Sequence, residues 1–179
     1  MARKSGIIHA DISPANLIVS TKDTRLVLID FGSSFRFTET NSKDSGDGFN
    51  SKYQSPEISR GAPADRLSEQ FGAATVFYEM LTKRLPFSDA EKLDPAMLKV
   101  GLPLASQRKS ASNPELPDAI WRAVDEHLKI ALSLQRNKRF ATTQQWQDSA
   151  FQLKKFAESS SDVIPARKKG PGLFQKWFG

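Results

Sequence analysis

Two short aliphatic runs separated by a polar turn constrain the fold of this chain most strongly. The runs are "LIV" (17–19) and "LVLI" (26–29), and the turn-prone stretch "STKDTR" lies between them. This pattern predicts an antiparallel β-hairpin. Asn16 precedes the first strand and Asp30 follows the second, and paired strands lie about 4.8 Å apart. The hairpin therefore brings an amide oxygen and a carboxylate together at one edge.

The residue types at this edge suit one kind of chemistry. Oxygen ligands favour Mg²⁺, which takes one or two carboxylates and completes its shell with water and phosphate oxygens. Asp11 lies one short loop before Asn16, close enough to accept a proton from a hydroxyl near that metal. The three residues thus fit phosphoryl transfer. The alternative is that Asp11 and Asn16 are turn or cap residues and that Asp30 only ends a strand. Three isolated polar residues do not decide between the two.

The rest of the chain is mainly helical. Residues 38–52 are polar and lack periodicity, which predicts a long loop. The stretch "SEQFGAATVFYEMLTKR", which begins at residue 68, is apolar on most sides and predicts a helix buried in the core. Residues 118–134 carry one apolar stripe, and Thr142 with Gln145 predicts a capping box at the start of a last helix. The predicted fold class is α+β, mainly α.

Composition excludes several classes of function. The chain has no cysteine and two histidines, which excludes disulfides and thiolate metal sites and makes zinc a poor candidate. The net charge is +6, but Arg167, Lys168, Lys169 and Lys176 lie in the last 13 residues, which contain no acid, so the body is nearly balanced. We therefore expect no nucleic-acid partner. No apolar run approaches the roughly 20 residues that cross a bilayer, and we expect a cytoplasmic protein.

Five stretches together resemble the C-terminal lobe of a eukaryotic-type serine/threonine protein kinase of the kind also common in bacteria. They occur in family order over roughly residues 5–157, and jointly they are highly specific. The stretches are "HADISPAN" (9–16), "DFG" (30–32), "YQSPE" (53–57), "SEQFGAATVFYEMLTKRLPF" (68–87) and "RNKRFATTQQW" (136–146). The resemblance implies a kinase-like C-lobe with a small β-hairpin and a long activation loop, with ATP and Mg²⁺ as cofactors and a protein as substrate.

The resemblance implies a role for each residue at the hairpin edge. Asp11 is then the catalytic base that receives the proton of the substrate hydroxyl. Asn16 is a magnesium ligand, and Asp30 is the principal magnesium ligand that bridges the ATP phosphates.

The resemblance also implies structural residues. His9 is expected to be buried and hydrogen-bonded, Phe31 to pack in the core, and Gly32 to give backbone freedom after the aspartate. Glu57 and Arg139 match a buried ion pair that ties the activation segment to the late helices. A bidentate bond to the carboxylate explains an arginine at this position.

Four positions depart from the family pattern and put catalytic proficiency in doubt. Ala10 replaces the arginine before the catalytic aspartate, and Ser13 replaces the lysine that steadies the transferring phosphate. Asn50 falls where a threonine usually contacts the same site. Glu69 stands for an aspartate that accepts bonds from the catalytic-loop backbone, and its extra methylene is expected to reposition that bond.

The amino-terminal lobe is the largest departure. No Gly-rich loop, strand lysine or partner glutamate occurs, and "MARKSGIIHADI" reads like the interior of a kinase domain. Met1 is then either a misplaced start or the edge of a gene fragment. We expect the fragment to be inactive alone and to need the missing lobe or an upstream segment as its partner.

Two alternative functions and the role of the C-terminal tail remain open. A small-molecule kinase of the aminoglycoside or choline type shares the His-x-Asp-x-x-x-x-Asn pattern, and a pseudokinase-like interaction module shares the frame. We divide the chain into a partial kinase domain (1–157) and a basic, aromatic tail (158–179). The tail is either a solvated terminus or a weak, salt-sensitive contact with anionic membranes.

Overall fold

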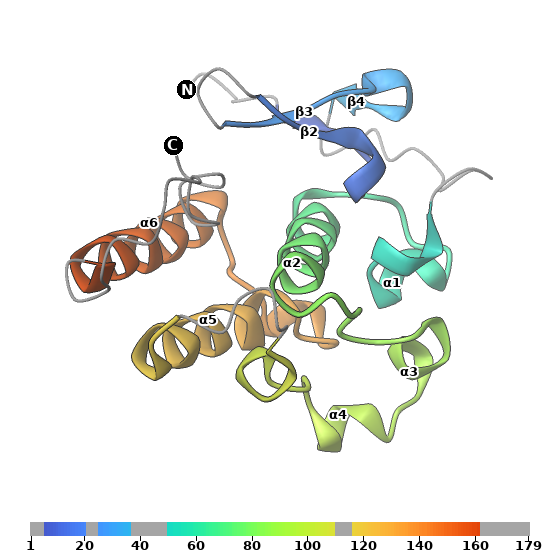
Figure 1. The fold of residues 1–179 in the computed structure, drawn as a ribbon. Helices are drawn as coiled ribbons and strands as arrows, with labels where there is room; N and C mark the ends of the chain where they lie inside the picture. The colour runs from blue at the N-terminus through green and yellow to red at the C-terminus, as the bar shows by residue number, and fades with distance from the viewer. Residues whose placement is uncertain (1–5, 21–24, 37–49, 110–115, 162–179) are drawn as a thin grey trace.

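A small β layer lies against one side of a helical body in the computed structural model (Figure 1). In β2 (Leu17–Val19) and β3 (Leu26–Leu28) the strands are antiparallel, with Leu17 opposite Leu28. The predicted hairpin is therefore confirmed. A second two-stranded ladder pairs β1 (Ile7–Ile8) with β4 (Phe35–Arg36). The structure describes residues 6–20, 25–36, 50–109 and 116–161.

The helical body follows the β layer in sequence. Its helices in the described ranges are α1 (Pro56–Ser59), α2 (Arg66–Thr82), α3 (Asp89–Leu93), α4 (Met97–Val100), α5 (Asp118–Ala131) and α6 (Thr143–Ser161). Short 3₁₀ turns connect the elements: η1 (Pro14–Asn16), η2 (Phe31–Ser33), η3 (Ser51–Tyr53), η4 (Ala105–Arg108) and η5 (Arg136–Lys138). The fold is mainly α with a small β part, as the sequence predicts.

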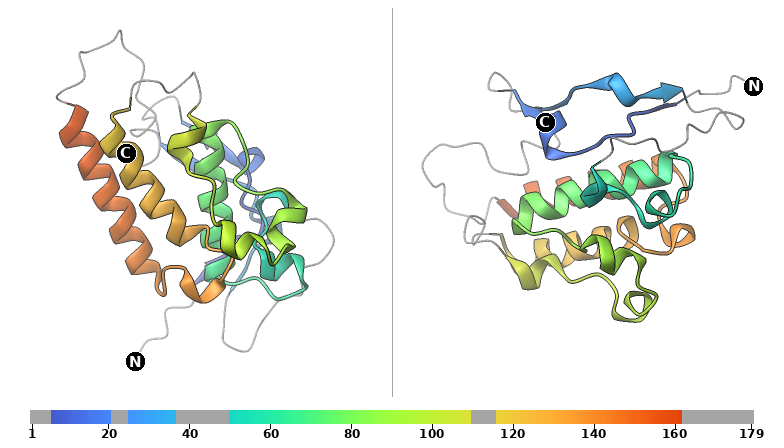
Figure 2. Two further views of the ribbon diagram at one scale, coloured as in Figure 1. Left: turned by 90° about the horizontal axis from the view of Figure 1, so that it is seen from below. Right: turned by 90° about the vertical axis from the view of Figure 1, so that its right-hand side faces the viewer.

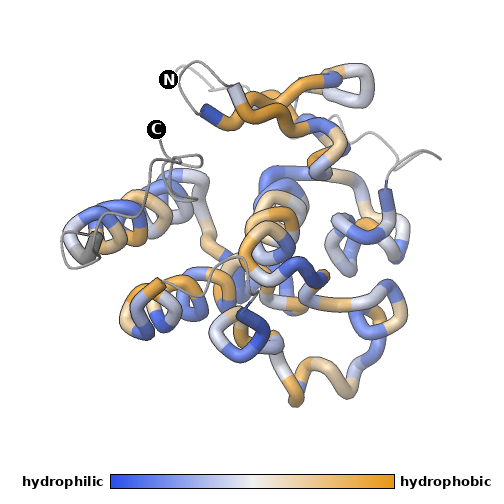
Figure 3. Tube along the Cα trace, in the orientation of Figure 1, coloured by the Kyte–Doolittle hydropathy of each residue, from blue (hydrophilic) through white to orange (hydrophobic). Residues whose placement is uncertain are grey.

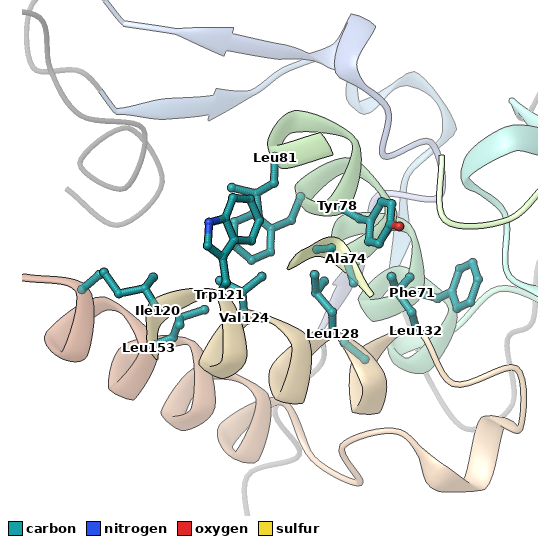
Figure 4. Close-up of a cluster of buried hydrophobic side chains, with 14 of the residues drawn as sticks. Phe71, Ala74, Tyr78, Leu81, Ile120, Trp121, Val124, Leu128, Leu132 and Leu153 are labelled. Carbon is teal, nitrogen blue, oxygen red and sulfur yellow. The ribbon is translucent and has the colours of Figure 1, made fainter. Parts of the chain in front are cut away.

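Helix α2 runs through the middle of the body and is buried on most sides, as predicted (Figure 2). The side chain of Asp65 caps its first turn by accepting bonds from the N–H groups of Leu67 and Ser68. The apolar side chains of α2 pack against those of α5 around the fully buried Trp121 (Figure 4). This helix is therefore the central buried element of the helical body.

Helices α5 and α6 pack side by side (Figure 2). The apolar stripe predicted for residues 118–134 is buried along α5. At the start of α6, the hydroxyl of Thr142 accepts from the N–H of Gln145 and the amide oxygen of Gln145 accepts from the N–H of Thr142. The predicted capping box is present. Helix α6 continues to Ser161, past the predicted domain boundary at residue 157, and Lys154 forms an ion pair with Glu158 one turn on.

Several predicted features lie outside the described residues. Most of the predicted loop does so, since residues 37–49 are not described, and its last part forms η3. The basic tail from residue 162 onward is also outside the described residues. Among the helices that the structure describes, none is both long and apolar enough to cross a membrane.

Candidate active site

The hairpin places Asn16 and Asp30 at the same end. The N–H of Ile29 donates to the carbonyl oxygen of Asn16 at 2.9 Å and extends the β2–β3 ladder by one step. Asp30 follows directly. Backbone pairing of the two strands thus brings Asn16 and Asp30 close in space although they are distant in the sequence, as the strand pattern predicts.

Asn16 is bound directly to Asp11. Its side-chain nitrogen donates to both the carbonyl oxygen and the carboxylate Oδ2 of Asp11, each at 2.8 Å. Because the amide nitrogen is used in this way, the amide oxygen of Asn16 is the atom that can bind a cation. The pair fixes the direction of the Asp11 carboxylate from within its own loop.

His9 anchors the same loop to the end of β3. The buried ring donates from Nε2 to the carbonyl oxygen of Ile29 at 2.9 Å, while Nδ1 accepts from the N–H of Asp11 at 3.3 Å. This pair of contacts assigns the neutral tautomer with its hydrogen on Nε2. The structure therefore places His9 as a buried, hydrogen-bonded support for the backbone of Asp11 and Ile29.

Asp30 begins a tight turn, and two predictions about its neighbours need correction. Phe31 was predicted to pack in the core, but its side chain is 54% exposed and contacts the ring of His9 edge-on at 4.8 Å. The strands beneath it are short, so the described residues cannot enclose the ring. Gly32 was predicted to supply backbone freedom, yet its φ is not positive. A Cβ there would lie 3.1 Å from Oδ1 of Asp30, so a side chain at this position would require the carboxylate to shift by a few tenths of an ångström.

Glu69, in the first turn of α2, holds the backbone of residues 9–16, the segment that matches the family's catalytic loop and is called the catalytic loop below. Its two carboxylate oxygens accept from the N–H groups of His9 at 3.0 Å and Ala10 at 2.7 Å. Burial raises the pKa of Glu69, and the two backbone bonds oppose that rise. The longer side chain thus serves two successive N–H groups while Ala10 sits in the left-handed region at φ 69°.

Glu57 and Arg139 form the bidentate ion pair that the resemblance implies. The two guanidinium nitrogens donate to the two carboxylate oxygens at 2.6 and 2.8 Å. The same arginine donates to the carbonyl oxygens of Leu67 and Ser133 and covers the ring of Phe71. Burial opposes ionisation of Glu57, but the bonds and charge of Arg139 outweigh it and lower its pKa. The pair lies away from Asp11 and joins the segment after η3 to the late helices.

Sequence reasoning missed a second anchor, a buried lysine. The side chain of Lys92 in α3 is 1% exposed, and its Nζ donates to the carbonyl oxygens of Ser51 at 2.5 Å and Gln54 at 3.2 Å. Asp89 pairs with this Nζ at 2.8 Å and accepts from the hydroxyl of Ser51 at 2.7 Å. A lysine on a short polar helix reads as a surface residue, so the sequence carried no signal for this role.

A second missed contact fixes the same turn from α2. The hydroxyl of Tyr53 donates to a carboxylate oxygen of Glu79 at 2.8 Å. Burial of the phenol and the nearby carboxylate raise the pKa of Tyr53. Turn η3 is thus held from two helices.

A small cavity of about 40 Å³ lies between this turn and the catalytic loop. Ala10, Asp11, Asn50, Tyr53 and Glu69 are among the residues that line it. The structure therefore brings Asn50 to the side of Asp11, while the oxygen of its amide caps η3 through the N–H of Lys52. Ser13, by contrast, is buried at the start of η1 and does not line the cavity.

The donor set at the hairpin end suits a cation that binds few protein ligands. In the ranges that the structure describes, no three His, Cys, Asp or Glu side chains gather around one point. The available oxygen ligands are the carboxylate of Asp30 and the amide oxygen of Asn16. Proteins bind Mg²⁺ through one or two such groups.

The fold and site define a protein kinase domain. The sequence profile described as "Protein kinase domain" matches residues 2–151. The chain therefore belongs to the protein kinase family, and the resemblance inferred from its motifs is confirmed. Members of this family generally use ATP and a divalent metal ion.

Similar proteins agree with this assignment. The chain is 32% identical over 148 residues to a protein of Bifidobacterium longum named probable serine/threonine-protein kinase PknB, and the match covers 81% of this chain. A Lactococcus lactis protein of the same name is 32% identical and covers 69% of the chain. Each match spans 20% of the relative's length. The granulovirus kinase PK-1 of Cydia pomonella shares the fold, with a TM-score of 0.58 at 23% identity over 81% of this chain and 50% of that one.

Proposed function

We propose that this chain supplies the catalytic-loop half of a serine/threonine protein kinase, which transfers the γ-phosphate of ATP to protein hydroxyl groups. The observation that carries the proposal is the bond between Asn16 and Asp11 beside Asp30 at the end of the hairpin. This arrangement places the carboxylate of Asp11 near the two proposed oxygen ligands, Asn16 and Asp30. The serine/threonine kinases among the relatives support the choice of a protein substrate over a small molecule.

Each of the three residues has a task that its surroundings support. The amide oxygen of Asn16 and the carboxylate of Asp30 would hold Mg²⁺, which when bound neutralises phosphate charge. Asp11 would accept the proton of the substrate hydroxyl and orient its oxygen. Its carboxylate is already directed by Asn16, and its N–H is held by His9.

The face of the hairpin supports a further lobe as partner. Ile18 and Val27 lie opposite one another on β2 and β3, and both are exposed, as is Phe31. Figure 3 shows the hydrophobic character of these strands. Apolar side chains grouped in this way favour a covering surface, and we propose that an amino-terminal lobe and the adenine of ATP supply it.

A pseudokinase-like module is the second candidate, because the described cavity beside Asp11 has no cation among its lining residues. A missing cation near developing phosphate charge costs a few kcal/mol of transition-state stabilisation. Such a module would keep the kinase fold and its structural contacts but would not transfer phosphate.

Mg-ATP transfer distinguishes the two candidates. The 179 residues are fused behind the amino-terminal lobe of a bacterial relative, and phosphate incorporation from labelled ATP into a mixture of Ser- and Thr-containing peptides is measured. We expect transfer that Asp11→Asn and Asp30→Asn each abolish. A well-folded fusion with neither transfer nor a Mg-ATP-dependent rise in melting temperature would favour the pseudokinase.

The tail calls for a separate experiment. We propose that its four cations and its aromatic residues give weak binding to anionic membranes. The full chain should cosediment with phosphatidylserine vesicles at low salt, release at high salt, and lose binding when residues 166–179 are deleted. Equal sedimentation of the full and shortened chains would contradict this.

A further inference from the structure

A second cavity is separate from the candidate active site, since Asp11, Asn16 and Asp30 are not among its lining residues. It measures about 270 Å³ and lies between α4 and the turn that follows α5. Figures 1 and 2 place α4 at the end of the helical body opposite the hairpin. Its apolar wall includes Phe87, Met97, Leu98, Leu102, Leu132 and Leu134. We call this cavity the α4 groove.

Helix α4 presents apolar side chains outward as well as inward. Met97 packs against the core, whereas Leu98 is 49% and Val100 71% exposed. Ile130 on α5 is also exposed. Figure 3 shows α4 as a largely hydrophobic segment on the surface. Exposed apolar side chains beside a hollow are typical of an interaction surface, because a partner that covers them removes apolar area from water.

The charges that line the α4 groove all have one sign. Lys129 and Lys138 line it, and no carboxylate does so. Lys129 pairs with Glu126 at 2.5 Å, but both side chains are well exposed, so this pair contributes little and is easily exchanged. Lys99 adds a third cation on the exposed side of α4. The residues that line the groove therefore favour an anionic partner that replaces Glu126 beside Lys129.

We propose that the α4 groove binds a peptide segment of a partner protein in which acidic residues alternate with large apolar ones. The apolar side chains would enter the groove beside Leu98, and the carboxylates would pair with Lys129 and Lys138. The tail of the chain itself does not suit this place, since its four cations have the same sign as the groove. The proposal does not depend on kinase activity.

Fluorescence anisotropy with the full chain tests the proposal. The probe is a labelled 12-residue peptide of alternating glutamate and leucine or phenylalanine, and its counterpart carries lysine in place of glutamate. We expect the acidic probe to bind and the basic one not to bind. Leu98→Asp and Lys138→Glu should each weaken binding by about tenfold or more. Added salt should weaken it further, because the lysines are exposed.

A matched control separates the α4 groove from the general positive charge of the chain. Lys155→Glu on α6 makes the same change in net charge as Lys138→Glu but lies on another helix. We expect the control to bind within about twofold of the native chain, with all variants folded by circular dichroism. An equal loss in Lys155→Glu, or equal binding of the basic probe, would overturn the proposal. A native dimer in sedimentation that Leu98→Asp dissolves would also overturn it, because the occupant would then be a second copy.

Discussion

Glu69 accepts hydrogen bonds from the backbone of His9 and Ala10, which lie 60 and 59 residues earlier in the chain. The carboxylate belongs to the first turn of α2, the most buried helix, and the two N–H groups begin the catalytic loop. The central helix therefore holds the backbone directly before Asp11 through one side chain, while Asn16 and the ring of His9 hold Asp11 itself.

Replacing Glu69 with glutamine should loosen the catalytic loop. Glutamine places an N–H₂ donor where one of the two backbone N–H groups needs an acceptor, so one buried donor loses its partner. We expect a loss of about 1–3 kcal/mol in the free energy of unfolding, measured in urea, with faster amide exchange at residues 9–11. Glu158→Gln on the exposed side of α6 is the control and should change little. Unchanged exchange at residues 9–11 would show that Glu69 does not hold the loop.

Arg139→Lys should be far from conservative. Lysine cannot reproduce the two parallel bonds to Glu57 together with the bonds to Leu67 and Ser133. It leaves a buried carboxylate poorly paired, and we expect a loss of about 3 kcal/mol in urea unfolding. Arg136→Lys is a matched comparison, because Arg136 pairs with Asp65 at a more exposed position. Equal losses in the two variants would contradict the importance given to the buried pair.

Lys92→Met should free turn η3 without unfolding the body. Methionine keeps the apolar stem of the side chain but removes the donors to Ser51 and Gln54 and the charge beside Asp89. We expect faster hydrogen exchange at residues 51–54 and nearly unchanged exchange in α5. Lys99→Met, a change at an exposed lysine, should leave the turn as it is. Native exchange rates in Lys92→Met would mean that Tyr53 and Glu79 hold the turn alone.

His127 should make stability depend on pH. Its ring is buried between Phe77 and Phe140 and bonds to the hydroxyl of Ser149 at 2.8 Å. Burial lowers its pKa from 6.5 to about 4. Between these values the unfolded chain binds a proton that the folded chain does not, so stability falls as the pH drops from about 6.5 to 4.

The contribution of His127 can be isolated by substitution. The full loss attributable to it is about 3 kcal/mol. His127→Gln keeps a hydrogen-bonding group but does not titrate, so its unfolding free energy should fall less over the same pH interval. Parallel pH curves for the native chain and the variant would contradict the assignment. The comparison cancels carboxylates such as Glu57, whose lowered pKa also costs stability in acid.

Local patterns predicted much of this molecule. Two short aliphatic runs around a polar turn located the hairpin, and the placement of Asn16 and Asp30 at the same end of it followed from strand geometry alone. The apolar stripe of α5 and the capping box of α6 could also be predicted, because they depend on residues three or four positions apart. These features are set within a single element or between neighbours in the chain.

Features that depend on distant packing were not predictable. Lys92 resembles a solvated surface lysine, and only the folded positions of Ser51 and Gln54 reveal its oxygen partners. Core packing of Phe31 was expected from the family resemblance, yet its side chain is half-exposed and contacts the ring of His9 edge-on. Residues 158–161 were assigned to the tail because they are polar, and the structure includes them in α6.

The pair formed by Glu57 and Arg139 also orders events during synthesis. The two residues are 82 positions apart, so Arg139 is added to the chain 82 residues after Glu57. At about 5–20 residues per second, that interval lasts roughly 4–16 s. During this time the carboxylate stays hydrated and the segment after η3 is free to move. A nascent chain that stalls before residue 139 would therefore present this segment to chaperones and proteases, whatever the state of its hairpin.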